Sequence, residues 1–298
     1  DGPAAWPRPS PVNVTRPDLG AHLAPFVRVG LDDLGAAGLM RREDTKFLLN
    51  SHGLPDLLRW LERSYRLLEV AGLVEHDYRT LYFDTQAYDL FMAHHRGVLD
   101  RYKVRERKYV STDTLFLEVK HRDKKGVTRK SRTATAGWDD DLDPAATGMA
   151  GSGVTRHMGK LVPVMLNAYQ RLTLVAVDRP ERVTIDTGLW FSTPAGSVGL
   201  GHLSVAEVKQ ERIDRTSLVM ARLRELGVRP GGFSKYCMGV SLLVPGVKHN
   251  RFKPRLRRID RVTGFSHMWP DLQGFLLGAG VNLIAALLLV AGIYYRKS

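Results

Sequence analysis

The first candidate for chemistry in this chain is a strand-like run of alternating cations between positions 101 and 109 (Arg-Tyr-Lys-Val-Arg-Glu-Arg-Lys-Tyr). A β-strand sends residues i, i+2 and i+4 to one face. One face therefore collects Arg101, Lys103, Arg105 and Arg107. Like charges crowded on one face repel each other, so the arrangement becomes favourable where that face looks into a cavity that holds a dense anion. The run thus indicates a phosphate site.

The same alternation recurs in four other segments. They carry the sets Arg42/Asp44/Lys46, Glu118/Lys120, Arg182/Thr184/Asp186 and Glu207/Lys209. The residues between the charges are largely apolar or β-branched, as a half-buried strand requires. In any single strand the charged face could simply be the solvated one. Five such strands together favour a polar-lined barrel whose apolar residues pack outward against helices.

Composition indicates a folded globular protein and suggests a polyanionic partner. The chain has 298 residues, 44% of them hydrophobic and 25% charged, with a formal net charge of +13. Such an excess suggests nucleic acid, anionic lipid or phosphate-rich small molecules as partners. Nucleic acid is the weakest of these, because aromatic residues do not interleave the basic strands as stacking platforms. Cys237 is the single cysteine, which excludes an intrachain disulfide and argues against a zinc site.

The order of expected elements favours antiparallel pairing. We expect a disordered, proline-rich leader over residues 1–20, and helices over residues 54–70, 157–166, 215–226 and 234–244. Few crossover helices separate the strands, so neighbouring strands should run antiparallel. Closure into a barrel would remove the exposed sheet edges.

The C-terminal segment predicts a membrane anchor. Leu272 to Tyr295 carries no charge, and about 20 apolar residues cross a bilayer core. Trp269 precedes the segment and Tyr294 and Tyr295 close it, as interfacial anchors, and most nearby Lys and Arg residues precede it. The cation bias predicts a single-pass membrane protein with its large domain in the cytoplasm. Gly274 and Gly278 form a small-xxx-small pair that can seat a second helix and so an oligomer.

Eight short motifs follow one another between about residues 40 and 255. They are Arg42-Glu-Asp-Thr-Lys-Phe47, Tyr82-Phe-Asp-Thr85, Tyr102-Lys-Val-Arg-Glu-Arg107, Leu117-Glu-Val-Lys120, Tyr169-Gln-Arg171, Arg182-Val-Thr-Ile-Asp-Thr187, Glu207-Val-Lys209 and Ser234-Lys-Tyr236. Taken in order, these motifs resemble those of the VTC-type polyphosphate polymerase domain, within the CYTH or triphosphate tunnel metalloenzyme group. The resemblance implies an α+β fold, an antiparallel eight-stranded β-barrel tunnel with flanking helices. This tunnel domain would span residues 21–262, followed by the anchor in residues 263–298.

The resemblance also implies a set of site residues. The catalytic, phosphate-gripping set would be Arg105, Arg107, Lys120, Arg171 and Arg182. The substrate-binding set would be Lys46, Lys103, Lys209, Lys235 and Tyr169. Glu207 would hold Mn²⁺ or Mg²⁺.

The activity implied is a transfer of the terminal phosphate of ATP to a growing polyphosphate chain. The first strand has Asp44 instead of the Glu-x-Glu-x-Lys pattern of the triphosphatase branch, which favours the polymerase. Two alternatives remain open: a tunnel triphosphatase that uses water as acceptor, and a non-catalytic sensor of polyphosphate or inositol phosphate. The expected partners are ATP or another triphosphate, polyphosphate and membrane lipid, and not nucleic acid.

Overall fold

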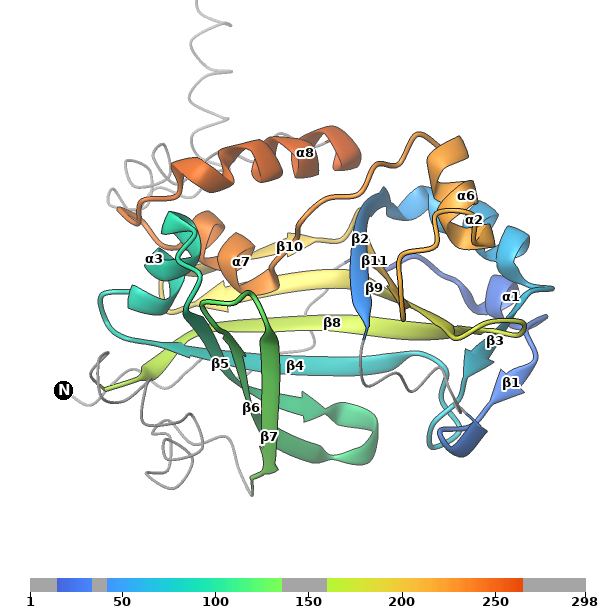
Figure 1. Cartoon of the computed structure of the whole chain (residues 1–298), viewed down its shortest axis with the longest axis horizontal. Helices are drawn as coiled ribbons and strands as arrows, with labels where there is room; N and C mark the ends of the chain where they lie inside the picture. The colour runs from blue at the N-terminus through green and yellow to red at the C-terminus, as the bar shows by residue number, and fades with distance from the viewer. Residues whose placement is uncertain (1–14, 34–41, 136–159, 265–298) are drawn as a thin grey trace, which may run out of the picture.

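The structure is a computed structural model that describes residues 15–33, 42–135 and 160–264. Its core is one curved, eleven-stranded sheet (Figure 1). Eight strands form its main path, in the order β2 (Glu43–Asn50), β11 (Leu203–Gln210), β9 (Glu181–Thr193), β8 (Val162–Ala176), β4 (His76–Asp84), β5 (Arg101–Tyr109), β6 (Thr114–Arg122) and β7 (Thr128–Ala134). Every neighbouring pair on this path is antiparallel, as the sequence predicts.

Three short strands extend the sheet. They are β1 (Arg28–Val29), β3 (Tyr65–Leu68) and β10 (Gly196–Leu200). β3 pairs with β8 and, in parallel, with β1, while β10 forms a hairpin with β9. Three single turns of 3-10 helix connect elements: Ser51–Gly53, Val110–Thr112 and Asn250–Phe252.

The prediction of a closed barrel is wrong for the part of the chain that the structure describes. β2 and β7 end the path, and no pairing between described residues joins them. The sequence of β7, Thr-Arg-Lys-Ser-Arg-Thr-Ala, has almost no apolar surface, and all seven of its residues are exposed. Charged edge strands of this kind resist pairing with another strand. The sheet is therefore a curved trough whose β7 edge is exposed and charged.

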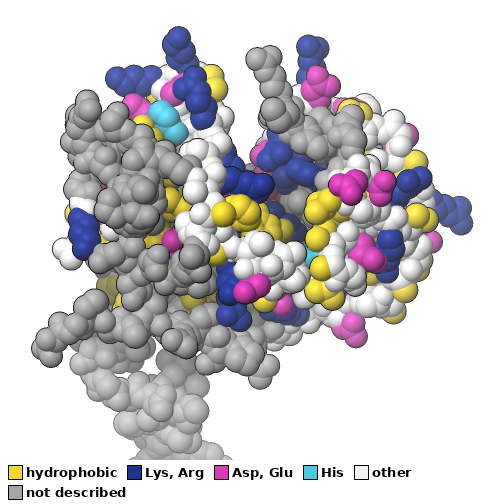
Figure 2. Space-filling view, turned by 90° about the horizontal axis from the view of Figure 1, so that it is seen from below, with side chains coloured by type: hydrophobic (Ala, Val, Ile, Leu, Met, Phe, Trp, Pro, Cys, Tyr) yellow, Lys and Arg dark blue, Asp and Glu magenta, His cyan; other side chains and the backbone are white. Residues whose placement is uncertain are grey.

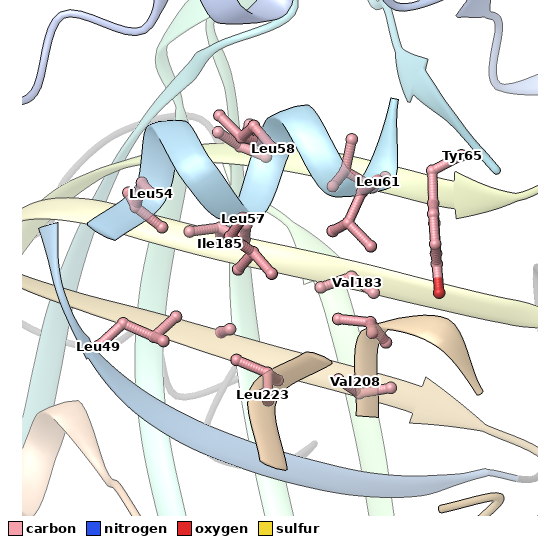
Figure 3. Close-up of a cluster of buried hydrophobic side chains, with 14 of the residues drawn as sticks. Leu49, Leu54, Leu57, Leu58, Leu61, Tyr65, Val183, Ile185, Val208 and Leu223 are labelled. Carbon is pink, nitrogen blue, oxygen red and sulfur yellow. The ribbon is translucent and has the colours of Figure 1, made fainter. Parts of the chain in front are cut away.

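Three helices cover the outer face of β2, β11, β9 and β8. They are α1 (Gly20–Leu23), α2 (Leu54–Leu61) and α6 (Leu218–Glu225). The leucines of α2 recur at helical spacing and point at the sheet, where Leu57 lies beside Ile185 of β9 (Figure 3). Leu223 of α6 belongs to the same buried cluster. This burial removes the apolar outer face from water and leaves the charged face turned inward.

The other face of the sheet is partly filled by a second group of helices. They are α7 (Lys235–Leu243), α3 (Asp89–Arg96) and α8 (Lys253–Thr263). α7 is buried along almost its whole length and packs on inward-facing residues such as Leu48 and Val205. The inward face of β2 and β11 is thus divided. Its apolar residues pack against α7, and its charged residues lie beyond the N-terminal end of this helix.

Several expectations about elements need correction. The helix expected over residues 54–70 ends at Leu61, because Tyr65–Leu68 forms β3. The helix expected over residues 157–166 is wrong from Val162 onward, where β8 begins. Of the expected leader, residues 1–14 lie outside the described residues, whereas Leu19 is buried in the core.

The expected anchor segment, Leu272 to Tyr295, also lies outside the described residues. Among the helices that the structure does describe, none has the length and apolar character needed to cross a membrane.

Candidate functional site

Strand register aligns the charged residues of β2, β11 and β9. Lys46 stands opposite Glu207, and Asp44 stands opposite Lys209. Lys209 in turn stands opposite Arg182. Directly paired residues of antiparallel strands share a face. The alternation seen in three separate segments therefore produces one continuous charged surface.

The same happens in β5, β6 and β7. Lys103, Lys120 and Lys130 form one cross-strand row, and Arg105, Glu118 and Arg132 form the next. β4 and β8 connect this half of the sheet to the first half, and residues of both charged surfaces line the same cavity.

These surfaces enclose a cavity of about 930 Å³. All eight strands of the main path contribute to its wall, and the N-terminal end of α7 adds Ser234 and Lys235. Its cationic lining residues are Arg42, Lys46, Lys103, Arg105, Arg107, Lys120, Lys130, Arg171, Lys209 and Lys235. Figure 2 shows Lys and Arg side chains gathered in a hollow of one face of the molecule.

Glu118 neutralises one group of these cations. Its carboxylate accepts from Arg105 at 2.7 Å and from Lys130 at 2.5 Å, and Arg107 lies 3.8 Å away. Burial alone would raise the pKa of Glu118, but the three cations lower it to about 2. Arg105 also donates to the hydroxyl of Tyr82 at 3.3 Å. The guanidinium groups are thus held in place on the cavity wall.

Asp186 organises a second group. It binds Arg171 through two parallel hydrogen bonds of 2.5 and 2.8 Å, and it also accepts from Lys235. The two cations outweigh the effect of burial and lower the pKa of Asp186. Tyr169 is 1% exposed and lies behind this group, with its ring centre 4.2 Å from the Lys235 ammonium. Asp186 thus fixes the guanidinium of Arg171 in the cavity wall, and the other N–H groups of this guanidinium are left to bind an anion.

Three lysines lie in surroundings that disfavour their charged form. Burial, and then repulsion from Lys46 and other cations, lowers the pKa of Lys103, whose hydrogen-bond acceptor is Ser234 at 3.0 Å. Desolvation and neighbouring cations lower the pKa of Lys120 to about 8. Burial lowers the pKa of Lys209 to about 8, against the opposing attraction of Glu207 at 3.2 Å. An anion with several charges would relieve this repulsion.

Glu207 lies beside a second carboxylate, Asp44. Burial and the neighbouring Glu207 raise the pKa of Asp44, whereas Lys209 and Lys46 keep the pKa of Glu207 low despite its burial. The pair fits Mg²⁺ or Mn²⁺, because such ions take one or two protein carboxylates and complete their shell with water and substrate phosphates. Among the described residues no cluster of three or more His, Cys, Asp or Glu is arranged to hold a metal.

The structure brings together most of the residues that the sequence predicts. All of them line the cavity except Arg182 and Tyr169. Arg182 lies on the same face beside Lys209, and its pKa is lowered by burial and by Arg42 and Arg171. The sequence identifies Glu118 and Asp186 as members of the alternating charged sets but assigns neither a role, and the structure shows that both carboxylates position the cations.

Sequence reasoning missed Lys130. It lies in a basic stretch that gives no apolar signal for a strand, yet it contributes to the cavity wall from β7.

A second cavity of about 620 Å³ adjoins the first. The two share Asp44, Lys46, Lys103, Phe233 and Ser234 in their walls. The second cavity adds further cationic residues, namely Arg101, Arg122 and Arg255. The basic lining therefore continues from the first cavity toward α8.

The chain is similar to several solved structures. No curated protein matches the chain significantly. Among solved structures, a putative adenylyl cyclase from Hippeastrum described as having a dominant triphosphatase activity is 20% identical, with a TM-score of 0.44, covering 70% of this chain and all (100%) of its own. A putative adenylate cyclase from Vibrio parahaemolyticus is 12% identical, with a TM-score of 0.40, covering 66% of this chain and 97% of its own.

The family is shown by the sequence itself. The model of the VTC domain matches residues 41–244, a stretch that contains all eight strands of the main path and every residue of the two carboxylate-centred cation groups. The resemblance predicted from the ordered motifs is confirmed, and the chain belongs to the VTC domain family.

Proposed function

We propose that this protein is a polyphosphate polymerase, which transfers the terminal phosphate of ATP to a growing polyphosphate chain. The observation that carries the proposal is the continuity of the basic lining across two adjoining cavities. A triphosphate held in the larger cavity leaves the smaller one for a second polyanion. A hydrolase needs only water beside its substrate, whereas a polymerase needs a path for an anionic acceptor.

The cavity offers what phosphoryl transfer requires. The chemistry depends mainly on positioning and on neutralising charge, with little covalent work for the protein. Arg105, Arg107 and Arg171 would grip the donor phosphates bidentately, and Lys46, Lys103 and other lysines would supply point charge. Asp44 and Glu207 would hold Mn²⁺ or Mg²⁺, which neutralises charge on the transferred group.

A tunnel triphosphatase is the second candidate. It is favoured by the proximity of Asp44 to Glu207, since two carboxylates on one metal are what the hydrolytic branch of the resemblance would use. The sensor alternative predicts binding without turnover.

One experiment separates the three. The full chain, in detergent, is incubated with ATP and Mn²⁺, and the products are resolved into polyphosphate, orthophosphate and ADP. The polymerase yields polyphosphate and ADP; orthophosphate as the sole phosphate product would establish the hydrolase, and unchanged ATP would establish the sensor. Arg171→Ala should abolish product. Arg129→Ala is the matched control, because Arg129 lies on the outward face of β7 with 72% of its side chain exposed.

We further propose that the protein is anchored in a membrane by the charge-free segment Leu272 to Tyr295, with the cavity on the cytoplasmic side. Arg255, Arg257 and Arg261 of α8 are exposed just ahead of this segment. They support the proposed orientation, since cations near a spanning segment favour the cytoplasmic side.

A further inference from the structure

Beyond Arg107, the inward face of the sheet changes from cationic to aromatic. Tyr109 follows Arg107 by two positions and stands opposite Tyr78 of β4. Phe116 of β6 stands opposite Arg107. Because paired residues share a face, these three rings continue the surface that carries the phosphate-gripping arginines.

The three rings form a contiguous wall, which we call the aromatic wall (Tyr78, Tyr109 and Phe116). The ring centres of Tyr78 and Tyr109 are 4.9 Å apart, and those of Tyr109 and Phe116 are 5.8 Å apart with their planes nearly perpendicular. The guanidinium of Arg132 lies over Phe116 at 4.7 Å. All three rings are only half-buried, and Arg132 is exposed, so part of this surface remains accessible.

The aromatic wall adjoins the phosphate-binding cations. The guanidinium carbons of Arg107 and Arg171 lie 5.7 and 5.1 Å from the centre of the Tyr78 ring. Two residues of strand advance about 7 Å, so Tyr109 lies roughly one sugar's length beyond Arg107. A nucleoside attached to phosphates held by Arg107 and Arg171 would reach the wall.

The opposite end of the cationic surface differs. The second cavity contains Phe233 and Phe252, but they are 6% and 4% exposed and serve as packing. Its accessible surface is cationic, with Arg101 and Arg122 in the wall. The two ends of the cationic surface therefore favour different ligand groups: a planar, uncharged group at the aromatic wall and a polyanionic group at the second cavity.

We propose that the aromatic wall, with Arg132, is a nucleobase subsite that fixes the orientation of the nucleoside triphosphate. The inference rests on the proposed function and adds to it the orientation in which the nucleoside triphosphate binds. The base stacks on the face of Phe116 that the Arg132 guanidinium now covers, with Arg132 moving to the other face of the base and the Tyr109 ring, nearly perpendicular to Phe116, against the edge of the base. The terminal phosphate then points toward Lys46 and Lys103. Stacking of this kind tolerates any base, because every base has a π-face.

The test compares two probes that share a triphosphate and differ in the base. The full chain is titrated calorimetrically with ATP and with inorganic tripolyphosphate, as wild type and as Phe116→Ala, Phe116→Tyr and Arg132→Gln. Phe116→Ala should weaken ATP binding about tenfold and leave tripolyphosphate within about twofold, while Phe116→Tyr should retain both. Arg132→Gln, at an exposed position that packing does not need, should also weaken ATP selectively.

Equal losses for both probes would overturn the subsite, because they would make the aromatic wall a structural support. Unchanged ATP binding in Phe116→Ala and Arg132→Gln would overturn it as well. A wild-type chain that binds neither probe would contradict the proposed function itself, which distinguishes the two failures.

Discussion

Glu118 and Asp186 are 1% and 3% exposed, and each is surrounded by cations of the cavity wall. Removing one partner from a buried ion group leaves an uncompensated charge, which costs several kcal/mol. At the scale of single residues, therefore, these carboxylates support the fold and hold the arginines in position. Lys103 and Lys120, whose pKa values are lowered by burial and by neighbouring cations, would be stabilised in their charged form by a bound anion.

Glu118→Gln should reveal this support through pH. The pKa of Glu118 falls from its ordinary value of 4.5 to about 2 in the folded protein. The contribution of its charge to the free energy of unfolding is therefore complete above about pH 4.5 and is lost as pH falls toward 2. We expect the variant to be about 3 kcal/mol less stable at pH 7 and to lose less stability on acidification. Urea unfolding at a series of pH values measures both. Asp113→Asn, at an exposed carboxylate paired with Lys108 outside the cavity, should change neither.

Lys103→Met should separate stability from binding. Burial lowers the pKa of Lys103, and Lys46 and Arg105 repel it. The variant should melt a few degrees higher without ligand and bind tripolyphosphate about tenfold more weakly, which corresponds to about 1.4 kcal/mol. Thermal melting and calorimetry measure the two effects. Lys108→Met, on the other face of β5, is the matched control, and a similar loss of affinity there would contradict the assignment of faces.

At the scale of elements, α7 is the part that limits the cavity on one side. It can do so because Gly239 permits close approach: a Cβ at this position would lie 2.8 Å from Phe191 and 2.9 Å from Met165. The N-terminal end of α7 is fixed by Ser234, whose hydroxyl accepts from the Cys237 amide and from Lys103.

Gly239→Ala should therefore destabilise the protein by about 1–3 kcal/mol through overpacking, although alanine is the better helix former. A lower melting temperature would be the observed result. Gly53→Ala is the control, because nothing lies within 4 Å of the added Cβ and the backbone there, at φ −85°, suits any residue. An unchanged melting temperature for Gly239→Ala would contradict the tight packing of α7.

The elements differ in how well sequence predicts them. Period-2 alternation identified β5, β6 and β11, because charged residues recur at every second position in each of them. The N-terminal part of β8 was mistaken for a helix, since both of its faces are largely buried and it shows no clean alternation. β7 was missed for the opposite reason: it buries nothing and carries no apolar signal.

For the candidate site, the cations were predictable from type and spacing, whereas their pairing was not. The hydrogen bonds that Asp186 accepts from Arg171 and Lys235 join residues from β9, β8 and α7. Such contacts depend on strand order and on the placement of a helix, which local periodicity does not encode. The lack of pairing between β2 and β7 likewise depends on the curvature and strand order of the whole sheet, which no single segment encodes.

At the scale of the whole molecule, the proposed anchor predicts how the chain behaves in a cell. The full chain should sediment with membranes and resist extraction by high salt and alkaline carbonate, because hydrophobic burial of residues 272–295 would hold it in place. Fractionation and immunoblotting measure this. A matched chain that ends at Gly264 should leave the membrane fraction, and recovery of the full chain without detergent would contradict the anchor.

A second prediction at this scale concerns the proposed metal site, where an ion held by residues of two strands would also bind the substrate. Glu207→Gln keeps the size of the side chain and removes the charge that a hard cation needs. Turnover should fall at least a hundredfold, about 2.7 kcal/mol, while part of the tripolyphosphate binding persists on the remaining cations. An unaltered dependence of rate on Mn²⁺ concentration would remove Glu207 from the site.

The most direct test of the account is an experimental structure of the chain with tripolyphosphate and Mn²⁺, with anomalous scattering used to place the metal. We predict the triphosphate among Arg105, Arg107 and Arg171, inside the cavity of about 930 Å³, and the Mn²⁺ peak beside Glu207 and Asp44. A triphosphate bound outside this cavity, or a metal peak remote from Glu207, would contradict the central claim that the trough is a triphosphate site.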